Sequence, residues 1–184
     1  NIDEKAFYSC DNLEEVVIPN SVTSIGDHAF SRCENLKSIT FGESLSKISN
    51  SMLAACKILK NVNIPNNVKS IGNGAFLSCE KLESVTIGDS VTSIGSSAFS
   101  NCISLKEITI PPLVTEILED AFYNCIGLET VIFTKGQKKV IIEMNAFKNC
   151  RIKNITLDRN IEKISYQMFS SCKSLENIEI PSSV

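Results

Sequence analysis

Tryptophan is absent from this sequence of 184 residues, histidine occurs once, and no apolar run approaches the length of a membrane span. A spanning helix needs about 20 consecutive apolar residues, so we predict no direct membrane insertion. The opening residues, NIDEKAFYSC, lack the basic and then apolar segments of a signal peptide. The net charge of −3 is too small to indicate nucleic acid as a partner.

The shortage of histidine also argues against catalysis and metal binding. The sequence places no second group beside His28 to build a Ser-His-Asp or Cys-His arrangement. The pair Gly72 and Gly74 lacks the third glycine that a dinucleotide site needs. Zinc ligands cluster locally, whereas no two cysteines here are closer than 22 residues. We therefore predict a protein that is not an enzyme and has no catalytic residues, no metal site and no cofactor.

What the sequence does contain is a regular repeat, marked by eight cysteines. They fall at positions 10, 33, 56, 79, 102, 125, 150 and 172, which gives five steps of 23 residues, one of 25 and one of 22. A fixed period in the twenties is typical of a solenoid, in which each unit packs only on its neighbours. We expect residues 1–184 to form a single solenoid of about eight repeats, as a fragment of a longer array.

One repeat combines two periodicities, as the stretch IGNGAFLSCEKLESVTI (71–87) illustrates. Ala75, Cys79 and Leu82 fall at i, i+4 and i+7, the spacing of one face of a short helix. Residues 84–87 then alternate between polar and apolar, as on a strand that is buried on one side. Each unit should therefore contribute one or two helical turns and one strand. The eight strands should be parallel neighbours in one ribbon, with the helical turns on the opposite face.

The column of cysteines leaves two interpretations besides zinc, namely a disulfide framework and a row of buried thiols. Neighbouring Cα atoms about 5 Å apart would permit a disulfide. Side chains that stack in parallel, however, point alongside one another rather than toward one another. The sequence thus favours buried thiols, with cysteine acting as a small hydrophobic residue where the turns meet the sheet.

The running pattern L-x-x-I-x-I-P-x-x-V-x-x-I-G-x-x-A-F-x-x-C resembles the BspA-like class of leucine-rich repeats. The segments LKEITIPPLVTEILEDAFYNC (105–125) and LESVTIGDSVTSIGSSAFSNC (82–102) follow it almost throughout. The resemblance implies an α/β fold, a right-handed leucine-rich-repeat solenoid, found in surface and secreted proteins of bacteria and protists. It also implies adhesion and protein binding. We therefore expect a non-enzymatic, adhesion-type protein or glycan binder at the cell surface or secreted, with a structural spacer that presents another domain as the alternative.

Charged residues alternate in the column that follows the helix leucine. Six of its seven neighbouring pairs are opposite in sign, where chance would give about half. Such pairs favour one register of the stack, so we interpret the column as a register device rather than a ligand site. Its members are Glu14, Lys37, Lys60, Glu83, Lys106, Glu129, Lys153 and Glu176.

Two surfaces are candidates for ligand binding. The outward side chains of the predicted strands are small and polar, and they lack the Trp, Tyr and Arg that dominate strong contacts, so weak and multivalent binding is expected there. The seventh repeat carries a two-residue insertion and an excess of five positive charges, so its loop could hold an acidic partner or could simply be solvated. The candidate ligand face is Asn63, Ser84, Thr86, Glu107, Thr109 and Ile132, and the candidate basic loop is Lys135, Lys138 and Lys139.

Overall fold

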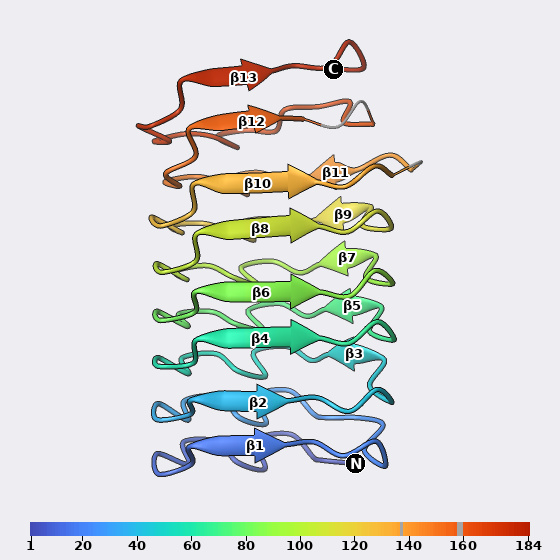
Figure 1. Ribbon diagram of the computed structural model, residues 1–184, viewed down its shortest axis with the longest axis vertical. Helices are drawn as coiled ribbons and strands as arrows, with labels where there is room; N and C mark the ends of the chain where they lie inside the picture. Colours follow the sequence, from blue (N-terminus) through green and yellow to red (C-terminus); the bar gives the residue numbers. More distant parts are fainter. Residues whose placement is uncertain (137, 158–159) are drawn as a thin grey trace.

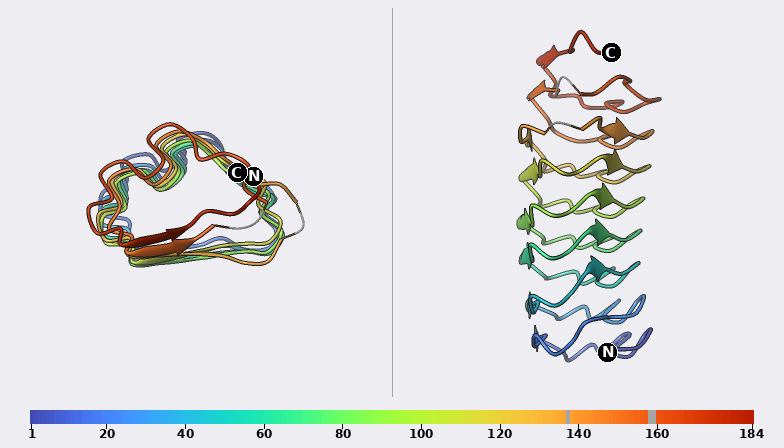
Figure 2. Two further views of the ribbon diagram at one scale, coloured as in Figure 1. Left: turned by 90° about the horizontal axis from the view of Figure 1, so that it is seen from above. Right: turned by 90° about the vertical axis from the view of Figure 1, so that its right-hand side faces the viewer.

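Short parallel strands, stacked coil upon coil, form the framework of the protein (Figure 1). The computed structural model describes residues 1–136, 138–157 and 160–184, and over these it is a parallel-strand β-solenoid of about seven turns. Seen from above, successive coils superimpose as closed loops, with the longer strands along one side (Figure 2). The two ends of the chain lie at opposite ends of the stack (Figure 1).

Eight of the strands in the described residues lie on one side, which we call the main face. They are hydrogen-bonded in parallel as four pairs, β1 with β2, β4 with β6, β8 with β10, and β12 with β13. The expectation of one continuous ribbon of bonded neighbours is therefore wrong, and wider gaps separate the pairs (Figure 1). The bounds are β1 (Glu15–Val17), β2 (Ser38–Thr40), β4 (Asn61–Ile64), β6 (Ser84–Ile87), β8 (Glu107–Ile110), β10 (Thr130–Phe133), β12 (Asn154–Thr156) and β13 (Asn177–Glu179).

A second wall of shorter strands holds coils together across some of these gaps. It is one parallel sheet in the order β11-β9-β7-β5-β3. This wall is formed by the extended stretches that follow β2, β4, β6, β8 and β10. The bounds are β3 (Lys47–Ile48), β5 (Ser70–Ile71), β7 (Ser93–Ile94), β9 (Glu116–Ile117) and β11 (Ile141–Ile142).

The third side of each coil consists of consecutive turns, so the predicted helical turns are wrong: the described residues contain no helix. In a helix each amide bonds to the carbonyl four residues earlier. Here the amide of Phe30 donates to the carbonyl of Met52 in the next coil, at 2.9 Å. The amide of Ala29 instead donates within its own coil, to Gly26. Alternate amides thus point along the stack, and this bonding between coils replaces the helix.

The described part of the chain accordingly offers no helix that is both long enough and apolar enough to cross a membrane.

Amides that alternate in direction require positive φ angles at two positions in every coil. Left-handed backbone is unfavourable for residues with a Cβ and natural for glycine. Gly74, at φ +60°, occupies the first of these positions, and His28, at φ +57°, occupies the same position two coils earlier. The set is Lys5, Ser9, His28, Arg32, Ser51, Ala55, Gly74, Ser78, Ser97, Asn101, Asp120, Asn124, Asn145, Asn149, Gln167 and Ser171.

Replacing Ala55 by glycine should therefore stabilise the protein. The φ of Ala55 is +59°, and left-handed backbone costs alanine about 1–2 kcal/mol. Glycine removes that cost but loses about 0.5–1 kcal/mol of unfolded-state entropy, which leaves a gain of about 0.5–1 kcal/mol. The neighbouring Ala54→Gly is the control, since Ala54 is buried and has no positive φ, and it should destabilise. Urea denaturation of both variants measures this, and a loss of stability in Ala55→Gly would contradict the strained-turn account.

The phenylalanine and cysteine columns fill the interior beneath the turns. Consecutive rings stack nearly parallel, with centroids 5.1 Å apart for Phe76 and Phe99 and 5.3 Å apart for Phe99 and Phe122. Leu53 interrupts this column, as its sequence indicates. Each stacked side chain buries apolar surface against two neighbours, so the core is continuous along the stack.

The eight cysteines are free thiols and seven of them are buried, which confirms the buried-thiol interpretation over the disulfide framework. Each buried thiol donates a hydrogen bond to the backbone carbonyl of the residue at the phenylalanine position one coil earlier. The Sγ of Cys102, for example, lies 3.2 Å from the carbonyl oxygen of Phe76. Cysteine therefore serves both as a small apolar residue and as a weak donor between coils. The other pairs are Cys33 with Phe7, Cys56 with Phe30, Cys79 with Leu53, Cys125 with Phe99, Cys150 with Phe122 and Cys172 with Phe147.

Candidate ligand-binding face and groove

The outward side chains of the main face line up in two columns. In β4, β6 and β8 the residues alternate between exposed and buried, so every second side chain points to solvent. Register places Asn63 beside Thr86 and Thr109 beside Ile132. Ser84 and Glu107 belong to the other outward column, two residues earlier in their strands than Thr86 and Thr109. The six residues predicted as a ligand face are all exposed on the same side of the stack.

Several of these side chains have their polar groups free. The Oγ of Ser84 is used internally, because it donates to the Oδ1 of Asn61 at 2.7 Å. Within the described residues, by contrast, the side chains of Asn63, Thr86 and Thr109 form no hydrogen bond. They remain available to hydrogen-bond a ligand or water.

The charged column contributes weakly to the contact between coils. Ion pairs join Lys37 to Glu14 at 2.6 Å, Lys60 to Glu83 at 3.9 Å, and Lys153 to Glu129 at 3.6 Å. All six side chains are about half exposed, and pairs of that kind contribute roughly 0–1 kcal/mol each. The register role of this column stays a prediction.

The lysines of the basic loop differ in their surroundings. Lys139 forms an ion pair with Glu162 in the following coil, at 2.5 Å. Lys135 and Lys138 are exposed, and neither has an acidic partner among the described residues. Two of the three predicted loop residues therefore carry charge that the described chain does not neutralise.

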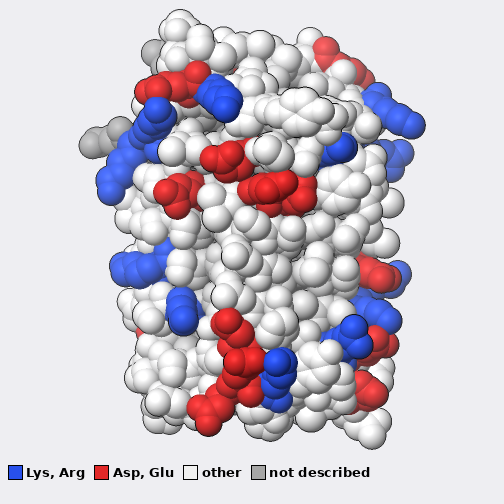
Figure 3. Space-filling view, turned by 180° about the vertical axis from the view of Figure 1, so that it is seen from behind, with Lys and Arg blue, Asp and Glu red and all other residues white. Residues whose placement is uncertain are grey.

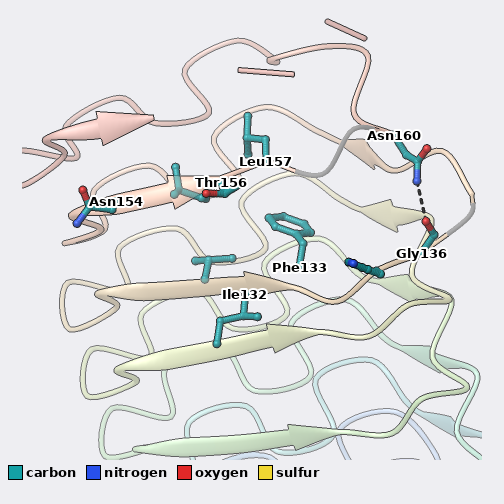
Figure 4. A pocket seen from close by; sticks show the side chains of 10 residues that line it. Ile132, Phe133, Gly136, Asn154, Thr156, Leu157 and Asn160 are labelled. Carbon is teal, nitrogen blue, oxygen red and sulfur yellow. Dashed lines mark hydrogen bonds between the residues drawn. The ribbon is translucent and has the colours of Figure 1, made fainter. Parts of the chain in front are cut away.

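A groove of about 870 Å³ separates β10 from β12, at one of the gaps between strand pairs (Figure 4). Ile132 of the predicted ligand face and Lys135 of the predicted basic loop both line it. The sequence presented these two residues as rival sites, whereas the structure brings them to one groove. A hydrogen bond of 2.9 Å from the Nδ2 of Asn160 to the carbonyl of Gly136 closes one end (Figure 4).

Phe133 also lines the groove and was not recognised from the sequence. It pairs in register with Ile110, which is buried, yet Phe133 itself is only partly buried. Leu157 lies across the groove from β10, on the segment that follows β12, and is buried (Figure 4). The sequence did carry a signal for it. Phe133 stands where the two preceding repeats have Ile87 and Ile110, and it lies next to the two-residue insertion.

On the side of the stack away from the main face, acidic and basic side chains are mixed. Seen from behind, Asp and Glu lie in a band across the upper half and in a second group in the lower half, with Lys and Arg beside them and along the edges (Figure 3). Among the described residues, no three His, Cys, Asp or Glu side chains are grouped so that they could hold a metal ion.

Comparison with known protein families identifies the type of repeat in this chain. The family described as "BspA type Leucine rich repeat region" matches the chain in six copies, over residues 1–129 and 99–184. No curated protein matches it.

Three crystal structures of bacterial leucine-rich repeat proteins are similar to the chain. The T. pallidum Leucine Rich Repeat protein is 32% identical, with 81% of this chain and 69% of that one covered and a TM-score of 0.77. A protein from Eubacterium ventriosum is 27% identical, with 93% and 56% covered and a TM-score of 0.61. One from Bacteroides ovatus, 24% identical over 96% and 58% with a TM-score of 0.66, shares the fold. The chain thus spans under two thirds of the last two proteins.

Proposed function

Because this chain belongs to the BspA-type leucine-rich repeat family, we propose that it is a non-enzymatic binding solenoid of a cell-surface or secreted protein. Its ligand is a protein or a glycan, held in an adhesion-type contact by weak and repeated interactions on the main face. The non-enzymatic role and the location rest on the family resemblance.

The observation that carries this proposal is the register of unpaired polar side chains on the main face. Asn63 and Thr86 are adjacent in one strand pair, and Thr109 and Ile132 are adjacent in the next. Equivalent groups recur at the spacing of the coils, so a ligand with its own repeat can meet several of them at once.

Weak contacts suffice when they are repeated. Small polar side chains contribute little each, and the aromatic and arginine residues that dominate tight interfaces are missing from these columns. Linked weak sites nevertheless gain avidity, since each further contact is made at a high effective concentration. The main face therefore suits an adhesive surface better than a single high-affinity site.

A structural spacer is the second candidate, and the shape of the stack supports it. The coils superimpose closely and the stack is straight, with the chain ends at opposite ends (Figures 1 and 2). Hydrogen bonds between coils run along the turns and along the second wall. A rod of this kind can hold another domain at a distance without binding anything.

A double substitution on the main face should distinguish the binding function from the spacer function. Thr86→Lys combined with Thr109→Lys should weaken binding to an immobilised extracellular-matrix extract at least tenfold, because charge and bulk then cover the polar column. Thermal stability should stay within about 0.5 kcal/mol, as is usual for exposed substitutions. Ser70→Lys with Ser93→Lys, on β5 and β7 of the second wall, adds the same charge elsewhere and should bind normally.

Two other outcomes of this titration would indicate a spacer or a different binding site. Failure of the unaltered protein to bind matrix proteins or a glycan array would favour the spacer. Full binding by the threonine variant, together with loss when Lys135, Lys138 and Lys139 are all changed to Glu, would move the site to the basic loop.

A further inference from the structure

We propose that the groove between β10 and β12 binds an extended peptide segment that carries an apolar side chain next to a carboxylate. This inference rests on the proposed ligand-binding function and names the ligand chemistry of one place on the main face.

The apolar residues that line the groove favour a ligand with an apolar side chain. Ile132 is 42% exposed and stands in a column whose preceding members are Asn63, Thr86 and Thr109. Phe133 is partly buried beside it, so the groove brings together two large apolar side chains that reach solvent, whereas the exposed Val17 of the same face lies in β1, in the first coil. Covering them removes apolar surface from water, which favours binding by roughly 25 cal/mol per Å².

The strands that border the groove add unpaired backbone groups. Within the part of the chain that the structure describes, β10 pairs with β8 alone and β12 with β13 alone, so no ladder joins β10 to β12 across the groove. Backbone N–H and C=O groups along the groove are thus left for a polypeptide ligand to hydrogen-bond. A sugar is less suitable, because it has no repeating N–H and C=O groups to pair with those of the strands.

The charge at the groove selects for an acidic ligand. Lys135 lines the groove without an acidic partner among the described residues, and Lys138 is exposed in the same loop. Lys139 and Lys153 nearby are already paired with Glu162 and Glu129. A ligand carboxylate would therefore meet Lys135 first, with attraction that weakens as salt is added.

The size of the groove fits a short segment. Ligand sites in proteins commonly measure about 300–1,000 Å³, and this groove, at about 870 Å³, falls within that range. The Asn160–Gly136 hydrogen bond closes one end, so the segment should lie along the strands with its carboxylate near Lys135.

The test uses a synthetic pentapeptide of alternating aspartate and leucine, acetylated and amidated at its ends, titrated into the protein and followed by amide NMR. Signals of Ile132, Phe133, Thr156 and Leu157 should shift. Ile132→Asp and Lys135→Glu should each raise the Kd at least tenfold, through repulsion of the carboxylates. Each variant has a matched control that should leave the Kd within about twofold, namely Thr40→Asp, at an exposed threonine of β2 far from the groove, and Lys47→Glu, at an exposed lysine on β3.

Three results would overturn the groove site. They are an unchanged Kd in Lys135→Glu, equal weakening by Ile132→Asp and Thr40→Asp, and tighter binding of an oligogalacturonate than of the peptide. The matrix titration of the Thr86→Lys and Thr109→Lys protein is independent of this peptide. The main face can therefore retain its proposed function even if the groove does not bind the pentapeptide.

Discussion

Above about pH 10 the solenoid is expected to unfold cooperatively, while it should keep its full stability below about pH 8.5. The cause lies in the buried thiols. Burial raises the pKa of Cys79 and of Cys125 to about 12, and it raises the pKa of Cys102 and of Cys150 well above the ordinary value for a thiol. A thiolate in that interior would be a buried charge with nothing to compensate it.

The direction of the effect follows from which state holds the proton. Between about pH 8.5, the ordinary pKa of an unfolded thiol, and pH 12, the unfolded chain has lost these protons and the native chain keeps them. Each such thiol then lowers the free energy of unfolding by about 1.4 kcal/mol per pH unit. Cys79 and Cys125 alone amount to about 5 kcal/mol at pH 10.5, which is comparable to the total stability of many domains.

Urea denaturation at a series of pH values from 8 to 10.5 measures this slope. A variant with Cys79→Ala and Cys125→Ala should be less stable at pH 8 but should lose stability more slowly as the pH rises. Ile94→Val removes a buried methyl group and no thiol, so it should lower stability equally at every pH. An identical slope in the cysteine variant and the unaltered protein would show that the thiols do not govern alkaline unfolding.

Replacing Phe99 by alanine is expected to lower the free energy of unfolding by about 3–5 kcal/mol. The side chain of Phe99 is fully buried, and its ring lies between those of Phe76 and Phe122, with interplanar angles of 4° on both sides. Its removal leaves a cavity and breaks two ring contacts in the middle of the stack. Because coils contact only their neighbours, the two halves should also unfold less cooperatively.

Two other variants calibrate this loss. Phe7→Ala removes the ring of a residue that is 40% exposed and that stacks on Phe30 alone among the described residues, so it should cost less than half as much. Phe99→Leu should also cost less than alanine, since the chain already accepts Leu53 at the equivalent position. Equal losses for Phe99→Ala and Phe7→Ala in urea denaturation would mean that the column of rings does not carry the stability of the stack.

Within the candidate site, the sequence indicated Ile132 and Lys135, but it indicated neither Phe133 nor the grouping of these residues. The alternation in strands such as residues 84–87 was sufficient to predict which side chains of the main face are exposed. It could not show that Ile132 and Lys135 share a groove with Phe133. That arrangement depends on a missing ladder between two strands, which no local pattern reports.

The sequence by itself determined the repeat, the family, the inward-facing columns and the buried thiols, because each of these depends on residue type recurring at a fixed spacing. Only the tertiary structure decided how the backbone satisfies its hydrogen bonds. Ala75, Cys79 and Leu82 are buried as a helical spacing predicts, yet the turn that carries them is not a helix. Its alternate amides bond to the neighbouring coil, as from Phe76 to Ala98, and such partners exist only once the coils have stacked.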